Sequence, residues 1–110
     1  MTEQRQKPVR VADGDELDDV LAAHDRVLVE FYTKGCTLCQ AIEPVLGNVA
    51  RETGITVAMA NPGDDVSLVE DWQIRSAPTL VLVEDGEEVA RLADGFQGGS
   101  AIEQFLDENT

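Results

Sequence analysis

Hydrophobic and polar residues follow three patterns along this chain of 110 residues. Val9 and Val11 alternate with a charged residue, a near-continuous apolar run fills 27–32, and other stretches place apolar residues three and four positions apart. Alternation and continuous runs indicate strands, whereas the wider spacing indicates amphipathic helices. The patterns predict strands at 9–11, 27–32, 55–60, 79–83 and 87–92, and helices at 15–23, 36–53, 64–72 and from Ser100 onward.

Residues that favour turns and caps mark the ends of these elements. Asp13 is suited to cap the first helix, and Gly54 to end the long one. Asp85 and Gly86 join the last two strands as a hairpin. Pro44 lies inside the long helix and is expected to kink it, because proline removes a backbone donor.

The helix predicted at 64–72 is shorter. Asp64 follows a turn at 61–63 and is expected to cap this helix. Val66, Val69 and Trp72 recur at helical spacing, so they are expected to point inward.

The predicted order of elements is β α β α β α β β α. Helices between the early strands indicate parallel βαβ units, and the final hairpin adds antiparallel strands. The fold class is therefore α/β, a three-layer α/β/α sandwich with a mixed central sheet. The length fits one domain, which we place at 9–110, preceded by a flexible N-terminal arm at 1–8.

Charge is the unusual feature of the composition. The chain has 22 acidic and 8 basic residues, a formal net charge of −14. Nucleic acid and anionic membrane surfaces are poor partners for such a field. An acidic, lysine-poor surface on an ordinary core is what adaptation to molar salt would produce, because the Debye length there is only about 3 Å. The alternative is a merely acidic protein from a dilute medium.

The chain contains no apolar stretch that approaches the ~18–20 residues of a membrane span. Its first ten residues are polar and carry no apolar segment of the kind found in secretory signals. We therefore expect a cytoplasmic protein.

Cys36 and Cys39 are the only cysteines, and they stand where a buried strand turns into a helix. Unpaired amides and the positive end of the helix dipole favour a thiolate on Cys36, which is the nucleophilic form. Three residues on, Cys39 lies on the same helical face and can reach Cys36 to close a disulfide. The pair therefore predicts reversible dithiol–disulfide exchange.

Two other interpretations of the cysteines remain open at this point. A closed zinc site needs four ligands, and the chain offers only His24 besides the two thiols, so metal would require a dimer. A purely structural disulfide over so short a loop constrains little of the unfolded chain. His24 itself is interpreted as a solvated residue at a helix end rather than a catalytic base, and no metal or bound cofactor is expected.

The sequence resembles the thioredoxin family over about residues 9–108. The resemblance rests on four features: the strand at 27–32, the Cys36-Thr37-Leu38-Cys39 motif opening a helix that contains Pro44, the segment at 74–80, and a glycine, Gly95, before the last helix. Together and in order, these features are specific.

The resemblance implies roles for particular residues. Cys36 would attack and Cys39 would resolve, while Pro78 would be a cis-proline facing the disulfide and Ala77 would offer its backbone to an extended substrate. The resemblance also implies that Gly35 and Gly95 contact the substrate. The alternative for Pro78 is an ordinary trans proline at the start of a strand.

Glu30 matches the buried acid of the family, which usually is aspartate. Desolvation would keep its carboxyl partly protonated, so that it could relay a proton to or from Cys39. The alternative is a glutamate at the end of the sheet that reaches water or an arginine.

This chain departs from the family pattern at three places. Thr37 and Leu38 replace the usual Gly-Pro between the cysteines, so the family's redox potential does not transfer. Gly35 replaces the usual tryptophan, which removes apolar contact surface, and Met59 replaces a lysine near the buried acid. Lys34 beside the motif could favour the thiolate, although a solvated loop lysine is the simpler interpretation.

From these features we predict a thiol–disulfide oxidoreductase that reduces protein disulfides through a Cys36–Cys39 cycle, in electron transport and cell redox homeostasis. Its expected partners are disulfide-containing proteins and a thioredoxin-reductase-like electron donor, and the chain is expected to be a monomer. The alternatives are glutaredoxin-like thiol exchange, although the motif and charge do not suit glutathione, and a redox-sensing or protein-binding module with little turnover.

Overall fold

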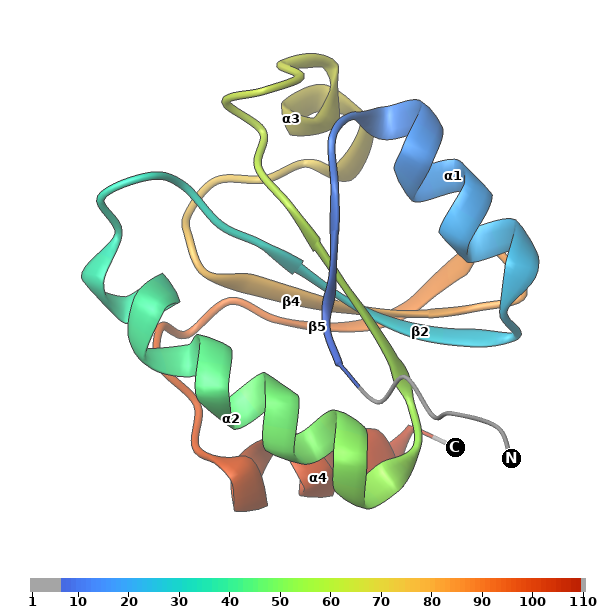
Figure 1. The fold of residues 1–110 in the computed structure, drawn as a ribbon, viewed down its shortest axis with the longest axis vertical. Coiled ribbons are helices and arrows are strands. Elements are labelled where there is room, and N and C mark those ends of the chain that lie inside the picture. The colour runs from blue at the N-terminus through green and yellow to red at the C-terminus, as the bar shows by residue number, and fades with distance from the viewer. Residues whose placement is uncertain (1–6, 110) are drawn as a thin grey trace.

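The computed structural model describes residues 7–109. The expected flexible arm falls almost entirely on residues outside this range. In the described part, a five-stranded sheet carries four helices (Figure 1). The elements are β1 (Val9–Val11), α1 (Gly14–Ala23), β2 (Arg26–Phe31), α2 (Thr37–Thr53), β3 (Thr56–Ala60), α3 (Ser67–Trp72), β4 (Thr79–Glu84), β5 (Glu87–Leu92) and α4 (Gly99–Glu108).

The sheet is mixed, and its strand order is β1-β3-β2-β4-β5. β3 pairs in parallel with both β1 and β2, because a helix returns the chain between these strands. β4 runs antiparallel to β2, and the hairpin sets β5 antiparallel to β4. The predicted order of elements and the α/β/α fold class are thus confirmed.

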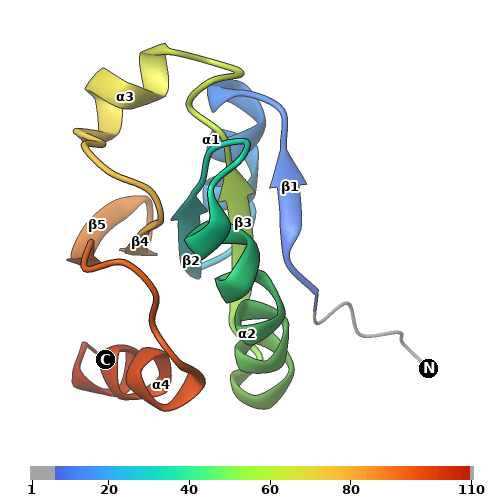
Figure 2. The ribbon, with the colours of Figure 1, turned by 90° about the vertical axis from the view of Figure 1, so that its left-hand side faces the viewer.

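Two apolar cores lie on the two faces of the sheet. α1 and α3 cover one face, and α2 and α4 cover the other (Figures 1 and 2). In β2, Val27, Val29 and Phe31 enter the α1/α3 core, whereas Leu28 enters the α2/α4 core. Alternation along the strand places Glu30 on the same face as Leu28, under the helix that begins at the cysteines.

The predicted capping residues Asp13 and Gly54 lie at the ends of two helices. Asp13 caps α1, since its Oδ1 accepts a hydrogen bond from the Glu16 amide at 2.9 Å. Gly54 ends α2 with φ 78°, and its N–H donates to the Ala50 carbonyl at 2.9 Å. α2 continues as one helix through Pro44 to Thr53.

The predicted start of the short helix and two of its three inward positions are wrong, whereas Trp72 packs against the α1/α3 core as predicted. α3 begins at Ser67, and its first position has no side-chain cap. Val66 is 75% exposed and Val69 41% exposed, whereas Leu68 is 2% exposed. The helix is six residues long and starts later than predicted, so a different set of positions faces the sheet.

Asp65, rather than the predicted Asp64, organises this segment. Its Oδ1 accepts hydrogen bonds from the Ser67 amide at 3.1 Å and hydroxyl at 2.7 Å, and its Oδ2 accepts one from the Gly14 amide at 2.9 Å. These bonds hold the start of α1 beside the turn before α3. Hydrogen bonding also keeps the pKa of Asp65 below its usual value, because it stabilises the ionised form.

The two edges of the sheet differ in shape. β1 contributes only three residues. In the β4–β5 pairing, Leu82 pairs with Ala90 and Val83 pairs with Glu88, so the register shifts and Val89 is an extra residue on β5. Such a bulge bends the outer strand and increases its twist.

Candidate active site

Cys36 and Cys39 form a disulfide at the beginning of α2. β2 ends at Phe31, and the loop that follows delivers Cys36 as the N-cap of the helix. The Cα atoms of the two cysteines are 5.2 Å apart, and the Cys39 amide donates to Cys36 Sγ at 3.1 Å. A sulfur that accepts this amide at a helix N-terminus is stabilised as a thiolate once the disulfide is reduced.

The two cysteines differ in exposure. Cys36 is half-buried, whereas Cys39 is only 4% exposed. Gly35 before them has φ 76°, a left-handed conformation in which a residue with a side chain is strained. The turn therefore favours glycine where the family usually has tryptophan.

Ala77 and Pro78 lie next to the disulfide, and the peptide bond between them is cis. Cys36 Sγ is 3.8 Å from the Ala77 carbonyl oxygen. Beside this contact is a hollow of about 470 Å³. Its lining is mostly apolar, with Phe31, Pro62, Val69, Ile74 and Ala77, and its polar members are Thr33, Ser76 and Arg75.

Gly95 lies near the cysteine motif. Its φ is 85°, and a Cβ placed on it would lie 3.7 Å from Leu38 Cδ1, within the cysteine motif. Leu38 is 46% exposed and Phe96 is 45% exposed. Of the predicted contact residues, Ala77 thus lies beside Cys36, Gly35 and Pro78 adjoin these two in the chain, and Gly95 lies near Leu38.

A second, smaller hollow of about 250 Å³ reaches Cys39. Arg10, Tyr32, Glu43 and Met59 contribute to its wall. Arg10 forms an ion pair with Glu43, and its guanidinium carbon lies 5.2 Å from the centre of the Tyr32 ring. Sequence reasoning did not single out Arg10 or Glu43.

The position of Arg10 has a simple cause. β1 pairs with β3 so that Arg10 is the partner of Met59, and Met59 is in turn the partner of Glu30 on β2. A cation from the edge strand therefore lies near the acid although the position on β3 holds methionine. The signal in the sequence is the basic residue of the first strand, which has meaning only when the strand order is known.

Glu30 is fully buried, and neither of its carboxyl oxygens has a hydrogen-bond partner within residues 7–109. Burial and the nearby carboxylate of Glu43 raise the pKa of Glu30 to about 7, while Arg10 acts in the opposite direction. Near neutral pH this group can therefore bind or release a proton. The alternative in which Glu30 reaches water at the end of the sheet is wrong.

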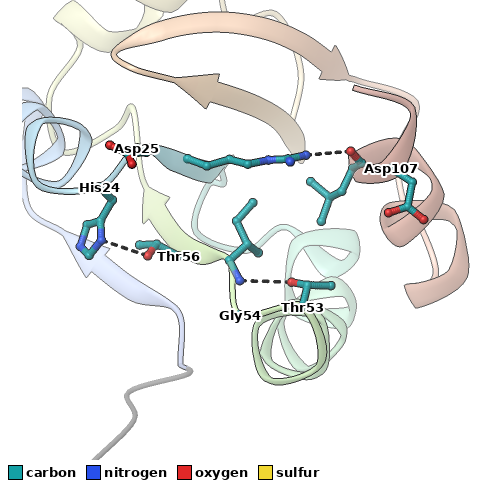
Figure 3. A pocket seen from close by; sticks show the side chains of 9 residues that line it. His24, Asp25, Thr53, Gly54, Thr56 and Asp107 are labelled. Atoms are coloured by element: carbon teal, nitrogen blue, oxygen red, sulfur yellow. Dashed lines mark hydrogen bonds between the residues drawn. The ribbon is translucent and has the colours of Figure 1, made fainter. Parts of the chain in front are cut away.

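His24 lies apart from the cysteines. It precedes β2, whereas the cysteines follow the other end of that strand. Its Nδ1 is 3.3 Å from the Thr56 hydroxyl, in a separate hollow of about 400 Å³ (Figure 3). In the part of the chain described here, the structure has no group of three or more metal-binding side chains. Nor does any described helix have the length and apolar character needed to cross a membrane.

The family model for thioredoxin matches residues 8–108. The chain belongs to the thioredoxin family. It is 33% identical over 102 residues to thioredoxin from Mycobacterium tuberculosis, covering 91% of this chain and 87% of the relative. A mutant thioredoxin from Halobacterium salinarum superposes with a TM-score of 0.90 at 34% identity, covering 100% of this chain and 96% of the other.

A bifunctional thioredoxin reductase/thioredoxin from Mycobacterium leprae is 30% identical over 102 residues, which cover 91% of this chain and 22% of that protein. Family membership and the Cys36–Cys39 disulfide identify the chain as a thiol–disulfide oxidoreductase. A binding module without turnover is not favoured.

Proposed function

We propose that this oxidoreductase reduces protein disulfides, with Cys36 as the attacking residue and Cys39 as the resolving residue. This assignment of the two cysteines is based on the difference in their solvent exposure. Cys36 is half-buried and borders the apolar hollow, whereas Cys39 is buried and lines the smaller hollow. A protein substrate reaches the first sulfur and not the second.

The cycle has two exchange steps. In the reduced protein, the Cys36 thiolate attacks one sulfur of the substrate disulfide, a mixed disulfide forms, and the other substrate sulfur leaves as a thiolate. Cys39 then loses its proton and attacks Cys36 Sγ, which releases the second substrate sulfur. Two electrons pass to the substrate, whose two thiolates take up protons from the solvent, while the proton of Cys39 leaves to a base. The protein is left with the disulfide seen here.

Glu30 is proposed to take the proton from Cys39. It lies on the sheet face beneath α2, it has no hydrogen-bond partner in the described chain, and its pKa near 7 suits exchange with a thiol. In this mechanism, Glu30→Gln slows release of the mixed disulfide and flattens the pH dependence of that step. Single-turnover kinetics across pH provide the measurement, and an unchanged profile would remove Glu30 from the mechanism.

Ala77 and its neighbours are proposed to bind the substrate. The Ala77 backbone borders Cys36, and an extended substrate segment can pair with it as an added strand. Gly35, Pro78 and Gly95 are proposed to complete this surface, because none of them carries a large side chain that would block the approach of a substrate.

We further propose that a thioredoxin-reductase-like protein returns electrons to the disulfide. The relative in which a reductase and a thioredoxin share one chain supports this pairing. A cytoplasmic location and a monomeric state complete the proposal.

Trapping tests the roles of the cysteines. Reduced Cys39→Ser should accumulate a mixed disulfide with a peptide substrate through Cys36, because the resolving thiol is missing. Cys36→Ser is the matched control and should trap nothing. Mass spectrometry of the adduct identifies the linked residue. Adducts through Cys39 in the Cys36→Ser variant, and none in the Cys39→Ser variant, would reverse the assignment.

A further inference from the structure

The hollow beside Cys36 has an unexpected charge. Acidic residues outnumber basic ones 22 to 8 in the chain, yet no acidic side chain lines this hollow. The one charged residue that does line it is a cation, Arg75. Arg75 is exposed and lies two residues before Ala77, along the same segment that borders the sulfur.

Arg75 also differs from the other arginines in the described chain. Three of them form ion pairs, namely Arg10 with Glu43, Arg26 with Glu84, and Arg91 with Glu88. A fourth, Arg51, donates to the Asn48 side chain. Within residues 7–109, Arg75 has neither an ion-pair partner nor a hydrogen-bond partner.

We propose that Arg75 binds a carboxylate of the substrate, so that the protein preferentially reduces disulfides flanked by aspartate or glutamate. This inference rests on the proposed substrate-binding role of Ala77. In an extended segment each residue advances ~3.3 Å, so a substrate side chain within two or three positions of the reacting cysteine reaches Arg75. The guanidinium group offers two parallel donors to a carboxylate, which a substrate amide cannot match.

The salt concentration distinguishes the local attraction between Arg75 and a carboxylate from the long-range repulsion by the net charge of the protein. At low ionic strength, the net charge of −14 repels an acidic substrate and opposes the local attraction. In molar salt, where the Debye length is about 3 Å, the long-range repulsion is screened, whereas a hydrogen-bonded pair in contact is affected less. The selectivity is therefore best measured in molar salt.

Two peptide disulfides test the inference. They are identical except for glutamate or glutamine two residues from the reacting cysteine. We expect wild-type protein in molar salt to give a kcat/KM about fivefold higher for the glutamate peptide, the factor expected from one exposed charge-assisted contact. Arg75→Gln should bring the ratio to about one, and Arg75→Lys should retain only part of it.

Arg51→Gln is the matched control, because it removes a cation from α2 without touching the hollow. It should keep both the rate and the ratio of the wild-type protein. A wild-type ratio near one, or a ratio that persists in Arg75→Gln, overturns the role of Arg75. If the wild-type protein reduces neither peptide, the proposed substrate class is wrong and this inference falls with it.

Discussion

Neutralising Glu30 should change how the free energy of unfolding depends on pH. The pKa of this buried carboxyl is about 7, against an ordinary value of 4.5. Below about pH 4.5 it is protonated in both the folded and the unfolded chain. Between that value and 7, the unfolded chain ionises while the folded chain stays protonated, so the wild-type protein loses stability as the pH rises. Above 7 the loss is complete.

The size of this loss follows from the shift. One pKa unit corresponds to about 1.4 kcal/mol, so the folded protein loses about 3 kcal/mol through Glu30 between about pH 4 and pH 8. That is a large part of a stability that typically lies at ~5–15 kcal/mol. Glu30→Gln has the same shape but does not titrate. The free energy of unfolding of Glu30→Gln, minus that of the wild-type protein, should therefore rise by about 3 kcal/mol over the same pH range.

Urea unfolding of the oxidised protein measures this difference. Trp72, the only tryptophan, reports on the core because its ring lies 5.5 Å from that of Phe31. The experiment is best done in molar salt, where the other charges are screened. Glu87→Gln, on the exposed part of β5, controls for the loss of one negative charge. A difference between Glu30→Gln and wild type that stays constant within about 1 kcal/mol would refute the reasoning.

Other predictions concern charge and local structure. Arg10→Gln should raise the midpoint of the Glu30 titration and Glu43→Gln should lower it, because the cation favours and the neighbouring carboxylate disfavours ionisation; carboxyl NMR follows both. Asp13→Ala should lower the free energy of unfolding by about 1 kcal/mol through loss of the α1 cap, measured in urea. Leu46→Ala, in the α2/α4 core, should cost about 2–5 kcal/mol in the same assay. The melting temperature should rise between low and molar salt, and a midpoint that does not rise contradicts salt adaptation.

The regular elements were predictable because each carries its own local signal. The apolar run at 27–32 is long enough to specify a buried strand, and β2 spans Arg26–Phe31. The apolar spacing before Gly54 specifies a helix, and α2 spans Thr37–Thr53. In both cases the burial of the element agrees with its local pattern.

The short helix shows where local signals fail. Asp64 and Asp65 are residues of the same type and equally suited to organise a turn. Asp65 does so, through local bonds from Ser67 and a tertiary bond from the Gly14 amide that no local pattern shows. Because α3 starts later than predicted, different positions of the helix face the sheet. Leu68 is therefore buried, whereas Val66 and Val69 are exposed. Six residues are too few for periodicity to correct the error.

The active site likewise contains some residues that the local sequence predicts and others that only the tertiary structure reveals. The cysteine pair was predictable because its chemistry depends on a spacing within one helix turn. Arg10 and Glu43 come from different elements, and only the pairing of β1 with β3 brings Arg10 into the neighbourhood of Glu30. Arg75 was visible in the sequence, but only the folded surface shows that it has no partner among residues 7–109.

The irregular edges of the sheet lead us to expect protection against aggregation by shape when the protein is in molar salt. An exposed strand edge is a template for joining another sheet, and many proteins guard it with charge. In molar salt, charge acts over only about 3 Å, so Glu87 and Glu88 give β5 little long-range protection. Shape provides the protection instead, because β1 is too short to recruit a neighbouring strand and the extra residue at Val89 interrupts the row of donors and acceptors on β5.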